Sequence, residues 1–179
     1  EARPFRRVTY RRFDRVEPPL YRADIACHET GPVWLCAGPK DAEAGALVGL
    51  STVAQAGGEA RRIRPEWRRL LASWDREVRV LFDADEAGRK GAEKAAQDLS
   101  EADCRTKVVH IEELASQTAG LQSVPNGFDL ADLVGEMVNL QELATREGLS
   151  STMPAAFCLT DLLAWRLWRR PPQRRPGRR

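Results

Sequence analysis

The segment over residues 79–91 constrains the fold more than any other part of the chain. An apolar run ends at Asp83 and Asp85, two aspartates one residue apart, and an alanine-rich segment with helical spacing follows directly. In extended backbone, residues i and i+2 point to the same side. The sequence therefore predicts that Asp83 and Asp85 converge at the carboxyl end of a strand, the edge at which open α/β sheets bind ligands.

The pair of aspartates has two interpretations. Two carboxylates held this close repel each other, and a hard divalent cation with oxygen ligands removes that repulsion. In the alternative interpretation, one aspartate caps the following helix and the other is solvated. The rest of the chain favours the metal site.

Strand and helix signals alternate along the chain. Strands are predicted over residues 33–36, 52–54, 78–82 and 107–111, and residues 112–127 read as a loop. Helices are predicted over residues 40–50, 65–74, 86–99, 130–149 and 154–168. This alternation predicts an α/β fold, with a mainly parallel four-stranded sheet, helices on both faces and further helices at the C-terminal end.

The charge of the chain is segregated. Residues 1–16 hold six arginines and two acids, residues 166–179 hold seven arginines and no acid, and the remainder has 15 basic and 24 acidic residues, a balance of −9. Basic ends around an acidic centre suit a protein that holds a polyanion and coordinates cations, although terminal arginine runs are also typical of disordered tails. We expect a basic N-terminal extension (1–16), one folded domain (17–150), an amphipathic helix (151–168) and an arginine-rich tail (169–179).

Several classes of protein are excluded by composition. The four cysteines are scattered without a C-x-x-C pair and there are two histidines, which excludes a zinc ribbon and indicates reduced thiols in a cytoplasmic protein. No apolar run is long enough to span a membrane. No phosphate-binding loop pattern occurs, so a fused helicase would lie outside this sequence.

Three motifs follow the predicted strands in order. The first strand leads into Ala37-Gly38-Pro39-Lys40-Asp41-Ala42, the third into Asp83-Ala84-Asp85-Glu86-Ala87-Gly88, and the fourth is followed by Asp129-Leu130-Ala131-Asp132. Together they resemble the TOPRIM domain, the metal-binding module of bacterial-type primases, of type IA and II topoisomerases and of some nucleases. The third motif and the lead-in over residues 19–22 are similar to those of phage and plasmid TOPRIM primases. The resemblance covers roughly residues 17–135.

The resemblance implies nucleotidyl transfer assisted by Mg²⁺ (or Mn²⁺). Asp83 and Asp85 would be the principal ligands, and Asp129 and Asp132 would complete or flank the site. Three cations at helix starts, Lys40, Arg89 and Lys90, would contact phosphates; each could equally be a solvated helix end.

One position departs from the family pattern. Ala37 stands where the family carries a glutamate, the expected metal ligand or acid/base, and alanine can do neither job. The loss of a positioned acid/base costs on the order of 10²–10⁴ in rate. Asp41 and Glu43 are the nearest replacement carboxylates, and Asp41 is predicted to join Asp83 and Asp85 as a catalytic residue; its alternative role is stabilisation of the first turn of its helix.

The resemblance therefore implies a primase-like replication protein from a mobile element, which acts on single-stranded DNA and nucleoside triphosphates, with a replicative helicase as a further partner. The loss of the glutamate leaves its activity open. The alternatives are a non-catalytic nucleic-acid-binding or scaffold module and a TOPRIM nuclease.

Overall fold

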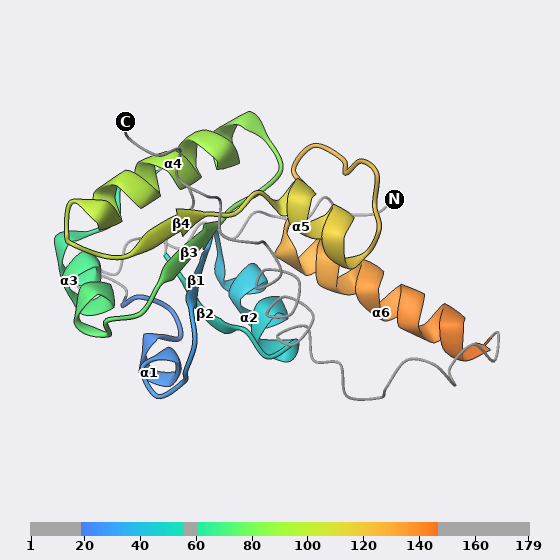
Figure 1. The fold of residues 1–179 in the computed structure, drawn as a ribbon, viewed down its shortest axis with the longest axis horizontal. Coiled ribbons are helices and arrows are strands. Elements are labelled where there is room, and N and C mark those ends of the chain that lie inside the picture. The colour runs from blue at the N-terminus through green and yellow to red at the C-terminus, as the bar shows by residue number, and fades with distance from the viewer. Residues whose placement is uncertain (1–18, 56–60, 147–179) are drawn as a thin grey trace, which may run out of the picture.

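The computed structural model describes residues 19–55 and 61–146 (Figure 1). The predicted helix over residues 154–168 and both basic ends lie outside this part of the chain. The elements in chain order are α1 (Ala23–Ala26), β1 (Val33–Cys36), α2 (Pro39–Leu47), β2 (Ser51–Ala54), α3 (Pro65–Ser73), β3 (Val78–Leu81), α4 (Glu86–Ser100), β4 (Thr106–Val108), α5 (Ile111–Thr118) and α6 (Leu130–Arg146).

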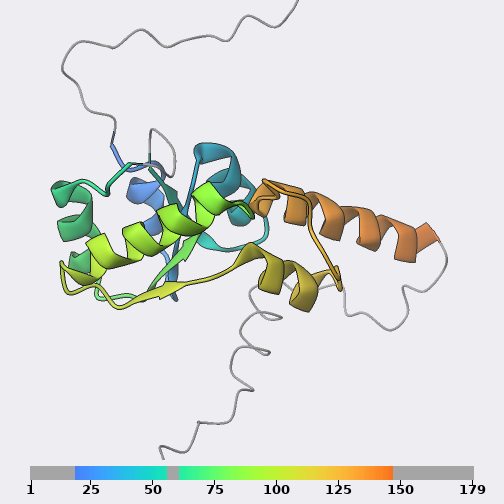
Figure 2. The same cartoon turned by 90° about the horizontal axis from the view of Figure 1, so that it is seen from above.

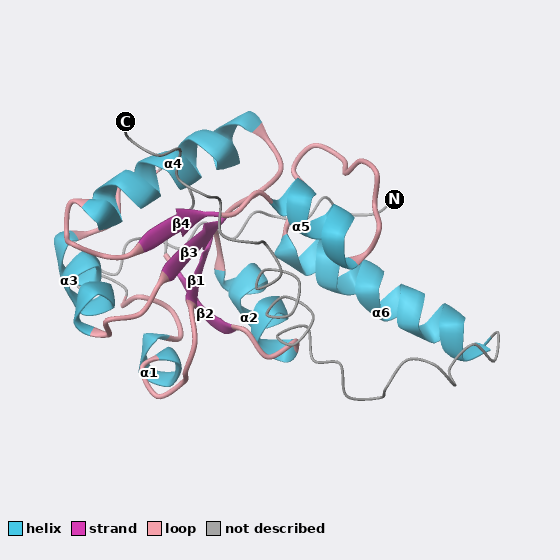
Figure 3. Ribbon diagram, in the orientation of Figure 1, coloured by secondary structure: helices cyan, strands magenta, loops and turns pink. Residues whose placement is uncertain are grey.

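The strands form one sheet in the order β2-β1-β3-β4, and every neighbouring pair is parallel (Figure 3). The last residue of β1, Cys36, lies opposite Ala54 of β2 and Leu81 of β3, so these three strands end at one level. The predicted parallel four-stranded α/β fold is confirmed, and β1 and β3 are direct neighbours.

Helices cover both faces of the sheet, as predicted. Val33 and Leu35 of β1 pack in one apolar cluster with residues of α3 and α4, whereas Trp34 and Cys36 pack in a second cluster with residues of α2, α5 and α6. Since β1 is buried on both faces, its four residues are all apolar and show no alternation.

The alanine-rich helix α4 lies close to the sheet because its inner face is made of small residues. Ala92, Ala95 and Leu99 are buried, and Ala96 is partly buried. On α3, Trp67 and Leu71 are buried, whereas Leu70, which the same spacing places inward, is partly exposed.

The prediction for residues 107–127 is wrong in part. Strand β4 ends at Val108, and Ile111, predicted as its last residue, is instead the first residue of helix α5. Ile111, Leu114 and Ala115 are buried at the i, i+3 and i+4 spacing of an amphipathic helix, and the last two lie in the segment that was predicted to be a loop. The loop was predicted from the glycines, the proline and the polar residues of 112–127, and the short apolar stripe at its start was not recognised.

Several other element boundaries differ from the predictions by one to three residues. Helix α2 ends at Leu47 because Gly49 turns the chain with a φ of 82°, and Leu50 packs in the core after that turn. Strand β3 ends at Leu81, one residue earlier than predicted.

The later turns of α6 extend beyond the rest of the described fold (Figure 2). Across the described residues, every helix is too short or too polar to cross a lipid bilayer.

Candidate metal centre

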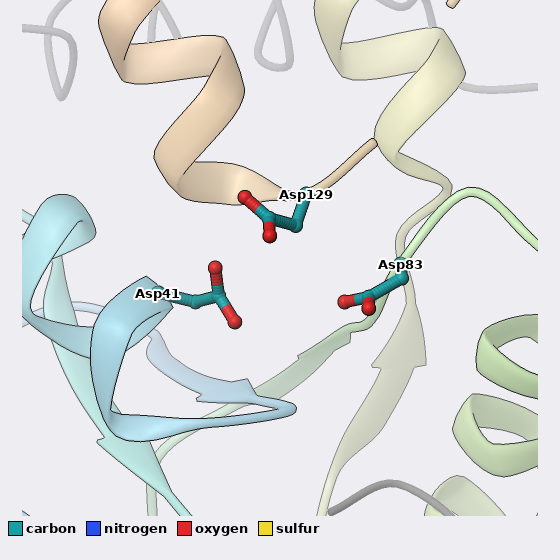
Figure 4. Close-up of side chains that lie close together, drawn as sticks. All are labelled: Asp41, Asp83 and Asp129. Atoms are coloured by element: carbon teal, nitrogen blue, oxygen red, sulfur yellow. The ribbon is translucent and has the colours of Figure 1, made fainter. Parts of the chain in front are cut away.

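Three aspartates from distant parts of the chain meet at the carboxyl edge of the sheet. Asp41 lies in the first turn of α2, Asp83 follows β3, and Asp129 precedes α6; one carboxylate oxygen from each lies within 4.8 Å of the other two. Figure 4 shows the three side chains pointing toward one another. Asp41 and Asp129 are buried and Asp83 is half-buried.

Asp41 is positioned by two helices. Pro39 starts α2 immediately after β1, which places Asp41 in its first turn. The Ala131 N–H, at the start of α6, donates to Asp41 Oδ1 at 3.4 Å. The Asp41 carboxylate therefore connects the N-terminal turns of α2 and α6, where negative charge is favoured by both helix dipoles.

Asp83 is held by a loop pairing and by a glycine. Next to it, the Ala84 N–H donates to the Phe128 carbonyl oxygen at 2.8 Å, and the Gly127 N–H donates to the Ala84 carbonyl oxygen at 3.3 Å. This pairing brings the loop before α6 alongside Asp83. A Cβ atom on Gly88 would lie 2.3 Å from the Asp83 carbonyl oxygen, so the first turn of α4 can approach Asp83 only with glycine at this position.

Asp129 and Asp132 form a reciprocal cap at the start of α6. The Asp132 N–H donates to Asp129 Oδ1 at 3.0 Å, and the Asp129 N–H donates to Asp132 Oδ2 at 3.2 Å. The other oxygen of Asp129, Oδ2, accepts a hydrogen bond and ion pair from Lys40 Nζ. Asp132 is exposed and is not one of the three clustered carboxylates, so its role as a flanking ligand stays a prediction.

Asp85 caps α4. Its Oδ1 accepts the Gly88 N–H at 2.6 Å, and its own N–H donates to the Asp83 carbonyl oxygen at 2.9 Å. The chain thus turns between Asp83 and Asp85, and the extended backbone from which their convergence was predicted is absent there. The capping interpretation describes Asp85 in this structure, and its role as a ligand stays a prediction.

The electrostatics of the cluster favour a bound cation. The pKa of Asp41 is raised to about 6, mainly by burial and then by the nearby carboxylates of Asp129 and Asp83, against the opposing effects of Lys40 and the Ala131 N–H. The hydrogen bond from Lys40 to Asp129 raises the pKa of Lys40. Three oxygen donors in a buried, mutually repelling arrangement fit a hard divalent cation such as Mg²⁺, which binds a few carboxylates and keeps several waters.

The remaining predicted residues have partners other than the three carboxylates. Arg89 donates to Glu112 of α5 at 2.8 Å, and Lys90 pairs with Glu86 one turn earlier on α4 at 2.5 Å. Of the three cations predicted to contact phosphates, Lys40 is therefore the one that contacts the carboxylate cluster. Glu43 accepts the Tyr21 hydroxyl at 2.7 Å and is not one of the clustered carboxylates.

A family model described as Toprim-like matches residues 35–117. This part of the chain belongs to the Toprim-like family. The match begins within β1 and ends within α5, so it includes Asp41 and Asp83 and ends before Asp129. The parallel sheet with helices on both faces agrees with this assignment.

Solved primase structures are also similar to the chain. The crystal structure of the Aquifex aeolicus primase (zinc-binding and RNA polymerase domains) shares 23% identity at a TM-score of 0.44, over 65% of this chain and 26% of that one. The primase fragment of the bacteriophage T7 primase-helicase protein shares 19% identity at a TM-score of 0.38, over 63% of this chain and 43% of that one. The chain thus aligns with less than half of either protein. A search of curated proteins gave no significant match.

Proposed function

We propose that this Toprim-like domain is the nucleotidyl-transfer part of a primase-like replication protein, and that it holds Mg²⁺ (or Mn²⁺) and acts on nucleoside triphosphates along single-stranded DNA. The observation that carries the proposal is the convergence of Asp41, Asp83 and Asp129 at the carboxyl edge of a Toprim-like sheet. Primase activity, a helicase partner and a mobile-element origin come from the sequence resemblance.

In the proposed reaction, the 3′-hydroxyl oxygen attacks the α-phosphorus of a nucleoside triphosphate. A new P–O bond forms, the bond to pyrophosphate breaks, and the hydroxyl proton passes to solvent or to a carboxylate. The bound cation supplies charge neutralisation and orientation of the phosphates. Asp41, Asp83 and Asp129 would hold the cation, and the exposed Lys40 side chain, which pairs with Asp129, would contact a phosphate.

Ala37 supports a second candidate function. The residue follows β1 directly and offers no carboxylate, so a Toprim-like domain of this sequence could bind metal and nucleic acid without efficient chemistry. In that case the protein would be a binding or scaffold module; a TOPRIM nuclease is a further alternative.

Metal binding is the first test. We expect Mn²⁺ to bind the wild-type protein weakly, and Asp83→Asn to reduce its affinity at least about tenfold, because the ion loses one of three charged ligands. Glu93→Gln, on the exposed face of α4, is the matched control and should bind as the wild type does. Proton relaxation enhancement by Mn²⁺ measures both. Equal affinity of Asp83→Asn and the wild type would exclude this cluster as the metal site.

Ala37→Glu separates the enzyme from the binding module. Cys36 of β1 lies opposite Leu81 of β3. Ala37 follows Cys36 directly, and Asp83 comes two residues after Leu81. A glutamate at position 37 should therefore reach the edge that Asp83 occupies. We expect primer synthesis from nucleoside triphosphates on single-stranded template to rise by roughly 10²-fold or more, as for a restored acid/base. If primer yield and metal-dependent melting both stay at wild-type values, the binding-module function replaces the primase.

A further inference from the structure

Lys40 occupies an unusual place for a lysine. It is the second residue of α2, where the helix dipole disfavours a positive charge. Its ammonium pairs with Asp129, 89 positions further along the chain, at the start of α6. The charge of Lys40 is thus directed at the carboxylate cluster, against the preference of its own helix.

The two oxygens of Asp129 have separate partners. Oδ1 accepts the Asp132 N–H and so belongs to the cap of α6, while Oδ2 accepts from Lys40. The cap holds the Asp129 side chain in place whether or not Lys40 is present. A divalent cation bound by Asp41, Asp83 and Asp129 would compete with Lys40 for Oδ2, the Asp129 oxygen that the cap of α6 does not use.

The ion pair is suited to exchange. The Lys40 side chain is 66% exposed, whereas that of Asp129 is 11% exposed. Ion pairs with an exposed, flexible partner contribute little net stability and are screened by salt. Lys40 can therefore leave Asp129 at small cost and stay nearby in solvent, while the carboxylate keeps its position.

From these contacts we propose that Lys40 is an internal counter-cation of the site: it neutralises Asp129 when no divalent cation is bound and is displaced from Oδ2 when one binds. The proposal rests on the proposed metal-binding function. It assigns Lys40 a role in setting metal affinity, and it makes the free ammonium available to an anionic ligand, such as a phosphate group, only in the metal-bound state. Metal and anion binding would then be positively coupled, since each favours the same displaced position of Lys40.

The test compares Mn²⁺ affinity in the full chain for the wild type, Lys40→Met, Lys90→Met and Asp83→Asn. Lys90 is the matched control, because it is also near the start of a helix, is exposed, and pairs with Glu86 outside the cluster. We expect Lys40→Met to bind Mn²⁺ about tenfold more tightly than the wild type, since the competing charge is removed, and Lys90→Met to change the affinity less than about twofold.

Ionic strength gives a second measurement. Monovalent salt screens the exposed ammonium, so the gap in affinity between Lys40→Met and the wild type should narrow from 0.05 M to 0.5 M salt as the Debye length shortens. Without divalent metal, Lys40→Met should melt at a lower temperature than the wild type, because three carboxylates lose a neighbouring cation. Lys40→Gln, which keeps a hydrogen-bond donor, serves if the methionine variant does not fold.

The outcomes separate the two proposals. If Asp83→Asn loses Mn²⁺ binding but Lys40→Met binds no more tightly than the wild type, the counter-cation role is overturned and the metal site stands. If Lys40→Met and Lys90→Met tighten binding equally, the effect is one of net charge and the role is likewise overturned. If Asp83→Asn binds Mn²⁺ as the wild type does, both proposals fail.

Discussion

Replacement of Asp41 by asparagine tests the electrostatics of the cluster directly. The ordinary carboxyl pKa of 3.8 rises to about 6 at Asp41, mainly because of burial and secondly because of Asp129. In Asp41→Asn the side chain keeps its size and an oxygen that can accept the Ala131 N–H, but it loses the charge. Without divalent metal, we therefore expect this variant to be more stable than the wild type at neutral pH.

The sign and size follow from proton linkage. Between about pH 4 and pH 6 the folded protein holds a proton on Asp41 that the unfolded chain has released, so the free energy of unfolding falls as pH rises through this window. A shift of about two pKa units corresponds to about 3 kcal/mol, fully expressed above pH 6 and absent below pH 4. Asp41→Asn should therefore exceed the wild type by up to about 3 kcal/mol at pH 7.5 and match it near pH 4.

Urea denaturation in the presence of a chelator, at several pH values, measures the difference. Glu93→Gln removes an exposed charge from α4 and should show no comparable pH dependence. Addition of Mg²⁺ at 100 times its Kd should offset most of this difference, because it stabilises the folded wild type by about 2.7 kcal/mol and Asp41→Asn binds it less well. A variant that is less stable than the wild type at pH 7.5 without metal would refute the reasoning.

Three further changes have defined outcomes. Gly88→Ala should destabilise the protein by about 2 kcal/mol in thermal or urea unfolding, because its Cβ would meet the Asp83 carbonyl at 2.3 Å, whereas Gly135→Ala, with no atom within 4 Å, should be neutral or stabilising. Asp98→Ala should lower the free energy of unfolding in urea by about 3 kcal/mol, since buried Asp98 accepts the Ile63 N–H and pairs with Arg62. Asp98→Asn should recover part of this loss, and an unchanged urea midpoint in Asp98→Ala would contradict the stabilising role of Asp98. Deletion of residues 169–179 removes six arginines and should flatten the slope of log affinity for single-stranded DNA against log salt; an unchanged slope would mean that the tail does not contact the nucleic acid.

The sheet could be predicted because its signals are local. Each strand is a short apolar run, and each connecting helix has its own apolar stripe. The α/β alternation and the parallel direction of the strands therefore follow from the sequence alone. The α5 helix could not be recognised in the same way. Its apolar stripe is short, and Ile111 at its start also extends the apolar run of β4. In the structure, Ile111 is buried in a core cluster that also contains residues of α2 and α6.

The sequence predicted which residues belong to the candidate site, but it did not predict how their side chains are arranged. Asp83 and Asp129 were expected, and both belong to the cluster. The pairing of Asp83 with Asp85 was inferred from strand geometry, and it depended on an extended backbone where the chain in fact turns. As a cap, the Asp85 carboxylate accepts the Gly88 N–H in the first turn of α4. Capping and metal binding would therefore compete for the same carboxylate.

Asp41 shows what the sequence could suggest but not decide. Its membership of the cluster depends on the packing of α2 against α6, a contact between segments about 90 residues apart. Once those helices pack, the first turn of α2 brings a carboxylate to the edge where the family glutamate would stand. A carboxylate at two helix N-termini is favourable for the fold, so it can supply charge for a cation at little structural cost. The Asp41 carboxylate, however, belongs to α2, whereas the family glutamate would stand at the end of β1. Under the proposed function, the chain would keep a metal site although position 37 carries no carboxylate, and it would lack an acid/base there, which is why metal affinity and primer synthesis must be measured separately.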